Sequence, residues 1–403
     1  MTETAERGAA PPHLDAGWYR RLLDELCAIE RPSASPGERE AAEWLVAQLG
    51  KLGLEARIES EPAHGTYWWP MGIATAAAAL GGLAALRGRR VAGTALAGLA
   101  ATAAIDDLPP NGRRRLRRLL PQGERSQVIA ELGPTDAERT VVISAHHDAP
   151  RSGLLFSPVI PELTLGWLPY EAVPKTSPPF MWAVVGGPLL TAAGAALGSR
   201  AITRAGVTLA VGTTAVLGDI AAHDVVPAAN DNGSGVVGLL ALARRFAEDP
   251  PQNVRLLFLS TSEEATCDGI AAFGERYFGE LPRDDTFFLC LETLGSPHLA
   301  VLRGEGMLRM REYPPRALAL LDGVAEELGV ELLPGLRNRS ATDAVVPLAH
   351  GYECAALVSV TKLHQLSNYH WPTDVPENVD YETLRDAVRI GERAVRRLDQ
   401  HWI

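Results

Sequence analysis

Three short apolar runs end at, or within three residues of, residues that can bind a metal, and this pattern constrains the fold more than any other feature of the chain. The run at 141–145 leads into His146, the run at 254–260 is followed closely by Glu263 and Glu264, and the run at 287–291 leads into Glu292. Continuous runs of this length are typical of strands that are buried on both faces. We therefore expect imidazole and carboxylate groups where buried strands end.

The pair Glu263-Glu264 is the most informative of these endings. Two adjacent carboxylates at the end of a strand repel each other unless a cation holds them. In a metal-assisted hydrolase one carboxylate can bind a divalent metal while the other moves a proton. The alternative is an ordinary exposed loop, since exposed glutamates are common.

Other polar groups occur at comparable positions along the chain. His146 can bind zinc, and Asp148, two residues later, can accept the N–H of its ring. Asp231 lies in a turn before an apolar helix predicted over 236–246, and His370 lies in a polar loop over 367–374. Taken singly, Asp231 could be part of a helix-capping turn and His370 an ordinary histidine.

Together these groups form an ordered series, and that series resembles the dizinc aminopeptidase family of the clan MH metallopeptidases, relatives of glutamate carboxypeptidase II and glutaminyl cyclase. The motifs are His-x-Asp, Asn-Asp-x-x-x-Gly, Glu-Glu, an acidic residue at a strand end, and Tyr-His-x-x-x-Asp. The resemblance covers residues 15–60, 124–150 and 223–403. It implies a zinc exopeptidase that acts on peptides.

The resemblance also implies a ligand set for two Zn²⁺ ions. One zinc would be held by His146 and Glu292, and the other by Glu264 and His370, with Asp231 bridging both.

The same comparison implies two further roles. Glu263 would be the general base, and Asp148 would orient His146. One departure concerns Glu292, because the family usually has aspartate there; the extra methylene keeps the ligand but can change the coordination of that zinc.

Zinc chemistry fits these residue types independently, because zinc binds imidazole nitrogen and carboxylate oxygen. The chain contains no His-Glu-x-x-His, Gly-x-Ser-x-Gly or Gly-x4-Gly-Lys-Ser/Thr motif. Two alternative functions remain at this point. One is a catalytically silent receptor or scaffold on the same fold, and the other is a glutaminyl cyclase-like acyltransferase.

Charge and cysteine content limit the partners and the compartment. The formal net charge of −11 argues against nucleic acid as a partner. The four cysteines have no framework spacing, which suits a reducing compartment; they are Cys27, Cys267, Cys290 and Cys354. The sequence does not predict an oligomeric state.

Two apolar insertions interrupt the expected catalytic domain, at 65–120 and at 151–222. The first contains uncharged stretches at 67–86 and 91–105. The second has a proline-rich loop followed by apolar stretches at 180–198 and 201–220. A stretch of about 20 apolar residues matches the thickness of a bilayer core, so we expect membrane hairpins, with buried hairpins of a soluble protein as the alternative.

Four such spans would make a multi-pass membrane protein and would return the chain to the side on which it started. The basic run at 113–118 favours the cytoplasmic face for the catalytic domain, in keeping with the positive-inside rule. The arginines at 87–90 favour the opposite orientation. The lack of a secretory signal pattern near the start of the chain agrees with the cytoplasmic interpretation.

The remaining pattern predicts a single three-layer α/β/α domain over 15–403, with a mixed, mostly parallel sheet and a loose tail at 1–14. Helices are expected over 17–29, 37–52, 315–328 and 380–402, and strands over 54–59, 299–302 and 354–360. Asp343 is expected either to border the substrate pocket or to cap a turn.

Overall fold

The computed structural model describes residues 14–110, 112–262 and 266–403. Its centre is a seven-stranded mixed sheet in the order β1-β2-β4-β3-β5-β10-β6. The middle strands β4, β3, β5 and β10 are parallel, and β1, β2 and β6 run antiparallel to their neighbours. The strands are β1 (Ala56–Ala63), β2 (Gly123–Leu132), β3 (Arg139–His146), β4 (Val254–Thr261), β5 (Thr286–Glu292), β6 (His298–Val301) and β10 (Glu353–Val360).

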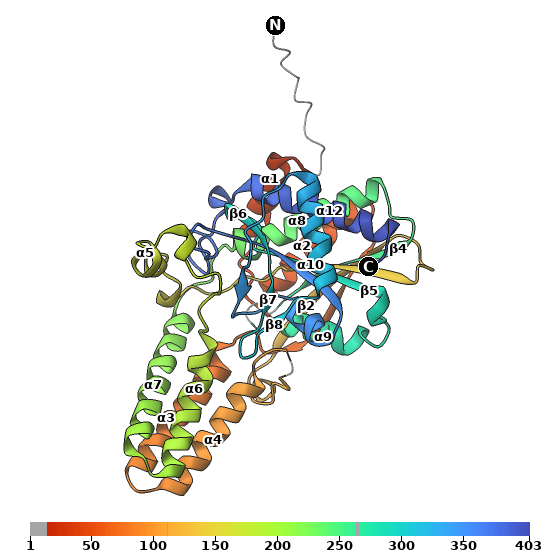
Figure 1. Cartoon of the computed structure of the whole chain (residues 1–403). Helices are drawn as coiled ribbons and strands as arrows, with labels where there is room; N and C mark the ends of the chain where they lie inside the picture. Colours follow the sequence, from red (N-terminus) through yellow and green to blue (C-terminus); the bar gives the residue numbers. More distant parts are fainter. Residues whose placement is uncertain (1–13, 111, 263–265) are drawn as a thin grey trace.

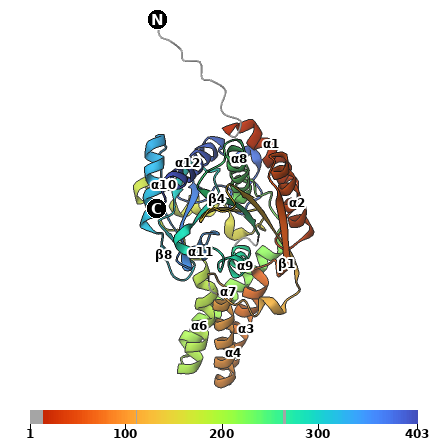
Figure 2. The same cartoon turned by 90° about the vertical axis from the view of Figure 1, so that its right-hand side faces the viewer.

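Helices cover both faces of this sheet, which confirms the predicted three-layer α/β/α fold (Figure 1; Figure 2). Alternate side chains of β3 point to opposite faces, so Val141 and Ile143 join one core cluster and Val142 the other. One face packs against α1 (Ala16–Cys27), α2 (Pro36–Lys51), α8 (Gly235–Glu248), α10 (Pro315–Leu328) and α12 (Tyr381–Gln400). The other packs against α9 (Asp268–Tyr277) and α11 (Val345–Ala349).

The apolar segments of the two insertions form helices that pack into one four-helix bundle. Figures 1 and 2 both show this bundle projecting away from the α/β/α layers. Its members are α3 (Trp68–Leu86), α4 (Arg90–Asp106), α6 (Met181–Leu197) and α7 (Arg200–Ala222). The sequence predicted two separate hairpins; in the structure α3 packs against both helices of the second hairpin as well as against α4.

Small residues allow the bundle helices to approach closely. A Cβ atom at Gly93 in α4 would lie 2.4 Å from the carbonyl oxygen of Gly81 in α3, and one at Gly206 in α7 would lie 2.4 Å from the backbone nitrogen of Thr191 in α6. At the far end, each hairpin caps the other. Arg90 donates to the carbonyls of Ala195 and Ala196 at 3.2 and 2.9 Å, and Arg200 donates to that of Leu86 at 3.1 Å.

Between the bundle and the sheet lie shorter elements that the sequence did not predict. Arg337 and Asn338 form β9, which completes a small three-stranded sheet with β7 (Gly304–Glu305) and β8 (Arg311–Glu312), in the order β8-β7-β9. The proline-rich loop contains η3 (Leu154–Phe156) and α5 (Val159–Leu165), and the segment before α8 is η5 (Ala229–Ser234). These elements surround the end of the sheet where β3 and β5 finish.

Candidate metal centre

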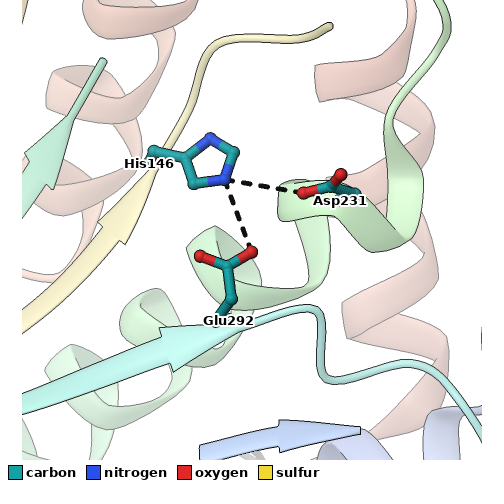
Figure 3. A group of neighbouring side chains, drawn as sticks. All are labelled: His146, Asp231 and Glu292. Atoms are coloured by element: carbon teal, nitrogen blue, oxygen red, sulfur yellow. Dashed lines mark ion pairs between the residues drawn. The ribbon is translucent and has the colours of Figure 1, made fainter. Parts of the chain in front are cut away.

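His146, Asp231 and Glu292 converge at one edge of the sheet (Figure 3). His146 is the last residue of β3 and Glu292 is the last residue of β5, and parallel neighbours end at the same edge. Asp231 comes from η5, where the chain enters α8. Nε2 of His146 lies 3.6 Å from Oδ1 of Asp231 and 3.5 Å from Oε1 of Glu292. All three side chains are buried.

The other ring nitrogen of His146 faces Asp148. Its Nδ1 lies 3.2 Å from Oδ1 of Asp148, a fully buried carboxylate that also accepts a hydrogen bond from Ser33. A carboxylate in this position orients the ring and favours the tautomer in which Nε2 is free to bind a cation. The predicted orienting residue therefore contacts the predicted ligand.

His370 approaches the same cluster from the opposite side of Asp231. Its Nε2 lies 3.3 Å from Oδ2 of Asp231, whereas His146 faces Oδ1. The ring of Phe156 packs on His370 with centroids 4.4 Å apart, and that of Tyr369 stacks on it at 3.8 Å. The two oxygens of Asp231 thus point to two different histidines, which is the arrangement that a bridging carboxylate needs.

Glu263 and Glu264 lie outside the described residues. The strand that precedes them, β4, pairs with β3 so that Thr261 is opposite His146. The two glutamates therefore come shortly after Thr261, the residue that pairs with His146.

The electrostatics of the cluster favour a positive charge between its members. Burial alone would lower the pKa of His146, but the charge of Glu292 and hydrogen bonds to Asp148, Asp231 and Glu292 raise that pKa well above its ordinary value. Burial would raise the pKa of Asp231, yet its hydrogen bonds to His146 and His370 hold it well below the usual range. Burial raises the pKa of Glu292.

One ligand atom from each of His146, Asp231 and Glu292 can be chosen so that all lie within 4.8 Å of one another. Imidazole and carboxylate are the donors that zinc takes in catalytic sites. The carboxylates that raise the pKa of His146 would also attract a divalent cation to this position. The residues therefore fit a metal centre.

Asp374 supports the segment that carries Asp231. It is buried, and its two carboxylate oxygens accept the backbone N–H groups of Asn230 at 2.8 Å and Asp231 at 3.0 Å. Burial raises the pKa of Asp374 to about 7. Asp374 closes the Tyr-His-x-x-x-Asp motif, so a sequence signal for it existed, but its contact with the backbone at 230–231 was not predicted.

Arg31 is a second supporting residue that the sequence did not reveal. Its fully buried guanidinium donates to the carbonyls of His147 at 2.7 Å, Pro227 at 2.8 Å and Ala228 at 2.9 Å. It thereby ties together the two segments that carry His146 and Asp231. A single arginine in a loop gives no local pattern from which this role follows.

Asp343 lies beside the cluster, on the wall of a cavity of about 1140 Å³ that also reaches His146, Asp231 and Glu292. Burial raises the pKa of Asp343 to about 6. Of the two expectations for this residue, the position at the border of the pocket is the one found.

Comparison with known proteins agrees with this site. The family model of peptidase family M28 matches residues 213–394. These residues are similar to peptidase family M28, which supports a metallopeptidase. The resemblance predicted from the sequence motifs is thus confirmed, and Asp231, Glu292 and His370 fall within the matched residues.

Solved structures share the fold of this chain over nearly its whole length. A glutaminyl cyclase from Bacteroides thetaiotaomicron aligns with a TM-score of 0.56 and 11% identity, covering 96% of this chain and 98% of that one. A leucine aminopeptidase precursor from the same organism gives 0.55 and 12%, with coverage of 96% and 98%. A Zn-dependent exopeptidase from Parabacteroides distasonis gives 0.53 and 12%, also with 96% and 98%. No curated protein sequence matches the chain.

Proposed function

We propose that this protein is a two-zinc aminopeptidase whose catalytic domain sits against a membrane. The observation that carries the proposal is the geometry of Asp231, whose Oδ1 faces His146 and whose Oδ2 faces His370. A carboxylate that serves one metal does not need a histidine at each oxygen.

In this proposal His146 and Glu292 would hold one zinc, Glu264 and His370 would hold the other, and Asp231 would serve both. Zinc bound there supplies Lewis-acid polarisation of the scissile carbonyl and lowers the pKa of the attacking water.

The chain itself supplies proton transfer and positioning. Glu263 takes a proton from the attacking water and passes it to the leaving nitrogen, so that water adds across the C–N bond and gives a carboxylate and a free amine. Asp148 holds the ring of His146 in the tautomer that leaves Nε2 available. Thr261 pairs with His146 and precedes Glu263 by two residues, which supports the role of Glu263 as the general base.

A glutaminyl cyclase-like acyltransferase is a second candidate, because solved structures with this fold include enzymes of that name. Such an enzyme closes an N-terminal glutamine on itself and releases ammonia without adding water. The pairing of Asp231 with two histidines favours the two-metal peptidase. The third alternative, a silent receptor or scaffold, is disfavoured by the buried, charge-rich cluster, which is costly to keep without a cation.

A panel of substrates separates these functions. We expect release of the first residue from unblocked peptides, no action on peptides with a blocked amino end, and loss of activity with a chelator that zinc reverses. Cyclisation of glutaminyl peptides without release of amino acids would identify the cyclase instead. A purified protein that binds zinc but acts on neither substrate would support the scaffold.

The four-helix bundle supports the membrane part of the proposal. In the described part of the chain, most of the large apolar side chains that are exposed lie on the four bundle helices, and the others lie at Leu119 and between Leu154 and Phe180. By length and composition, α3 and α7 could each cross a membrane, with 19 and 23 residues and mean hydropathies of 1.4 and 1.5. A buried helix of a soluble protein can meet the same criteria, so the exposure of the apolar side chains is the stronger argument.

The length of the bundle helices also agrees with the membrane proposal. Its helices have 17 to 23 residues, which gives lengths of roughly 26–35 Å, comparable to a hydrocarbon core of about 30 Å. A four-helix bundle then crosses the bilayer with both hairpins and leaves the α/β/α layers on one side.

For the orientation we propose the cytoplasmic face for the catalytic domain. The four cysteines are all unpaired thiols in the structure, which fits a reducing compartment. The basic run at 113–118 contributes less to this choice, because Arg114 pairs with Asp268 and Arg117 lies 2.8 Å from Asp107 inside the protein, while Arg113, Arg115 and Arg118 are exposed.

Both membrane statements can be tested in cells. The protein should remain with membranes after carbonate washing and require detergent for release. A cysteine introduced at Gly88, in the exposed turn at the far end of the bundle, should react with a membrane-impermeant maleimide from outside the cell. Recovery as a soluble protein without detergent would contradict the membrane proposal, and labelling only after lysis would reverse the orientation.

A further inference from the structure

The metal cluster and the bundle share one cavity. The cavity of about 1140 Å³ is lined at one end by His146, Asp231 and Glu292, and it extends along α5 and the halves of α6 and α7 nearest the sheet. Its volume is slightly above the usual range for small-molecule sites, about 300–1,000 Å³. The rest of the cavity can therefore hold an extended group of a substrate that is bound at the cluster.

The far part of this cavity is apolar. Its wall is formed by side chains of α5, the start of α6 and the second half of α7; they include Ile160, Leu165, Phe180, Val184, Leu209 and Val216. Several of these side chains are also open to the outside, with exposed fractions of 48% for Phe180, 36% for Leu209 and 37% for Val216. The cavity wall is thus continuous with the outer apolar surface of the bundle.

The apolar wall is fixed to the metal cluster by direct contacts. The backbone N–H of Leu154 in η3 donates to Oδ2 of Asp219 in α7 at 2.7 Å. Two residues later in the same η3 turn, the ring of Phe156 packs on His370. The position of α7 relative to the cluster is therefore set by one short loop, and a substrate can contact both at once.

Resting on the proposed peptidase function, we infer that the preferred substrates carry a linear apolar group on the leaving-amine side of the scissile amide. An aminopeptidase substrate has its length on that side, because only one residue precedes the bond. The amide lies at the cluster, and the apolar group lies along α5, α6 and α7, where it removes apolar wall from water.

Two sources supply such a group, an alkyl chain or a segment of apolar amino acids. A polar peptide would leave the apolar walls uncovered and would lose its own contacts with water, so it is the disfavoured substrate. If the bundle lies in a bilayer, α6 and α7 lie in the hydrocarbon core, where apolar substrates are concentrated.

The test uses two series of substrates and two matched variants. One series is leucine n-alkylamides from butyl to dodecyl, and the other is leucine followed by one to four apolar residues. A Cβ at Gly212 in α7, which lines the cavity, would have no neighbouring atom within 4 Å, so Gly212→Phe adds a large side chain at the cavity wall from an unobstructed position. Gly218→Phe is the control, because Gly218 in the same helix is also unobstructed and does not line the cavity.

We expect kcat/KM of the protein in nanodiscs to rise about two- to fourfold per added methylene until the cavity is filled. Gly212→Phe should lower the ratio of dodecyl to butyl rates at least tenfold relative to Gly218→Phe. The substrates partition into nanodisc lipid equally for both variants, so a difference between the variants does not come from partition. Binding of the dodecylamide to metal-depleted protein, measured by calorimetry, should show the same difference between the variants.

The outcomes separate the inference from the function on which it rests. Zinc-dependent hydrolysis that is independent of apolar length in both series, or equal ratios in the two variants, would overturn the inference and leave the peptidase intact. No zinc-dependent hydrolysis of any member would overturn the function, and the binding measurement would still report on the cavity. A gain confined to one series would identify the source of the apolar group.

Discussion

Replacing Asp374 by asparagine should weaken metal binding without touching a metal ligand. Its two oxygens accept the N–H groups of Asn230 and Asp231 at 2.8 and 3.0 Å. Asparagine keeps one acceptor and turns an NH₂ group toward the other N–H. The variant therefore loses one charge-assisted hydrogen bond and sets two donors against each other, a cost of about 2–3 kcal/mol. The segment relieves that cost by moving Asp231.

The expected result is zinc affinity lowered about 10- to 100-fold, the range usual for groups that orient metal ligands. The assay is competition for zinc with a chromophoric chelator, together with thermal unfolding of the metal-depleted protein. Asp399→Asn is the control, because Asp399 also accepts backbone N–H groups, from Gln252, Asn253 and Val254, at the start of β4. Unchanged zinc affinity in Asp374→Asn, or an equal loss in Asp399→Asn, would refute the reasoning.

Two further predictions concern other carboxylates. Glu263→Gln should keep its zinc and lose roughly two to four orders of magnitude in turnover, whereas Glu264→Gln should lose one zinc; near-normal turnover of Glu263→Gln would require another base. Glu305 is fully buried, and burial raises its pKa to about 8. Because the folded protein then holds a proton that the unfolded chain releases, the free energy of unfolding should fall as pH rises from about 4.5 to 8. Glu305→Gln should flatten this fall in denaturant titrations, and an unchanged slope would assign it to other groups.

The sequence predicted those parts of the fold that leave a local pattern. The continuous apolar runs before His146 and Glu292 became β3 and β5, and the helix expected at 315–328 matches α10. Ser35 followed by Pro36 marked the start of α2, where Ser35 accepts a hydrogen bond from Glu38. In each case the chemistry that fixes the element lies within a few residues.

Contacts between segments that are distant in the chain could not be predicted from local sequence patterns. The cross-capping of the hairpins by Arg90 and Arg200 joins residues more than 100 positions apart, so two predicted hairpins became one bundle. Arg31 reaches the carbonyls beside the metal cluster across a similar separation. Only part of the basic run at 113–118 is exposed, because Arg114 pairs with Asp268 and Arg117 with Asp107, and the run itself does not show which of its arginines are buried.

The most direct test of the account is the zinc content of the wild-type protein and of Asp231→Asn, measured by elemental analysis after dialysis against a fixed free zinc concentration. The proposal predicts two zinc ions per wild-type chain. It predicts fewer than one per chain in the variant, because Asp231 serves both positions through Oδ1 and Oδ2. A wild-type protein that saturates with one zinc, or a variant that retains two, would contradict the bridging role of Asp231.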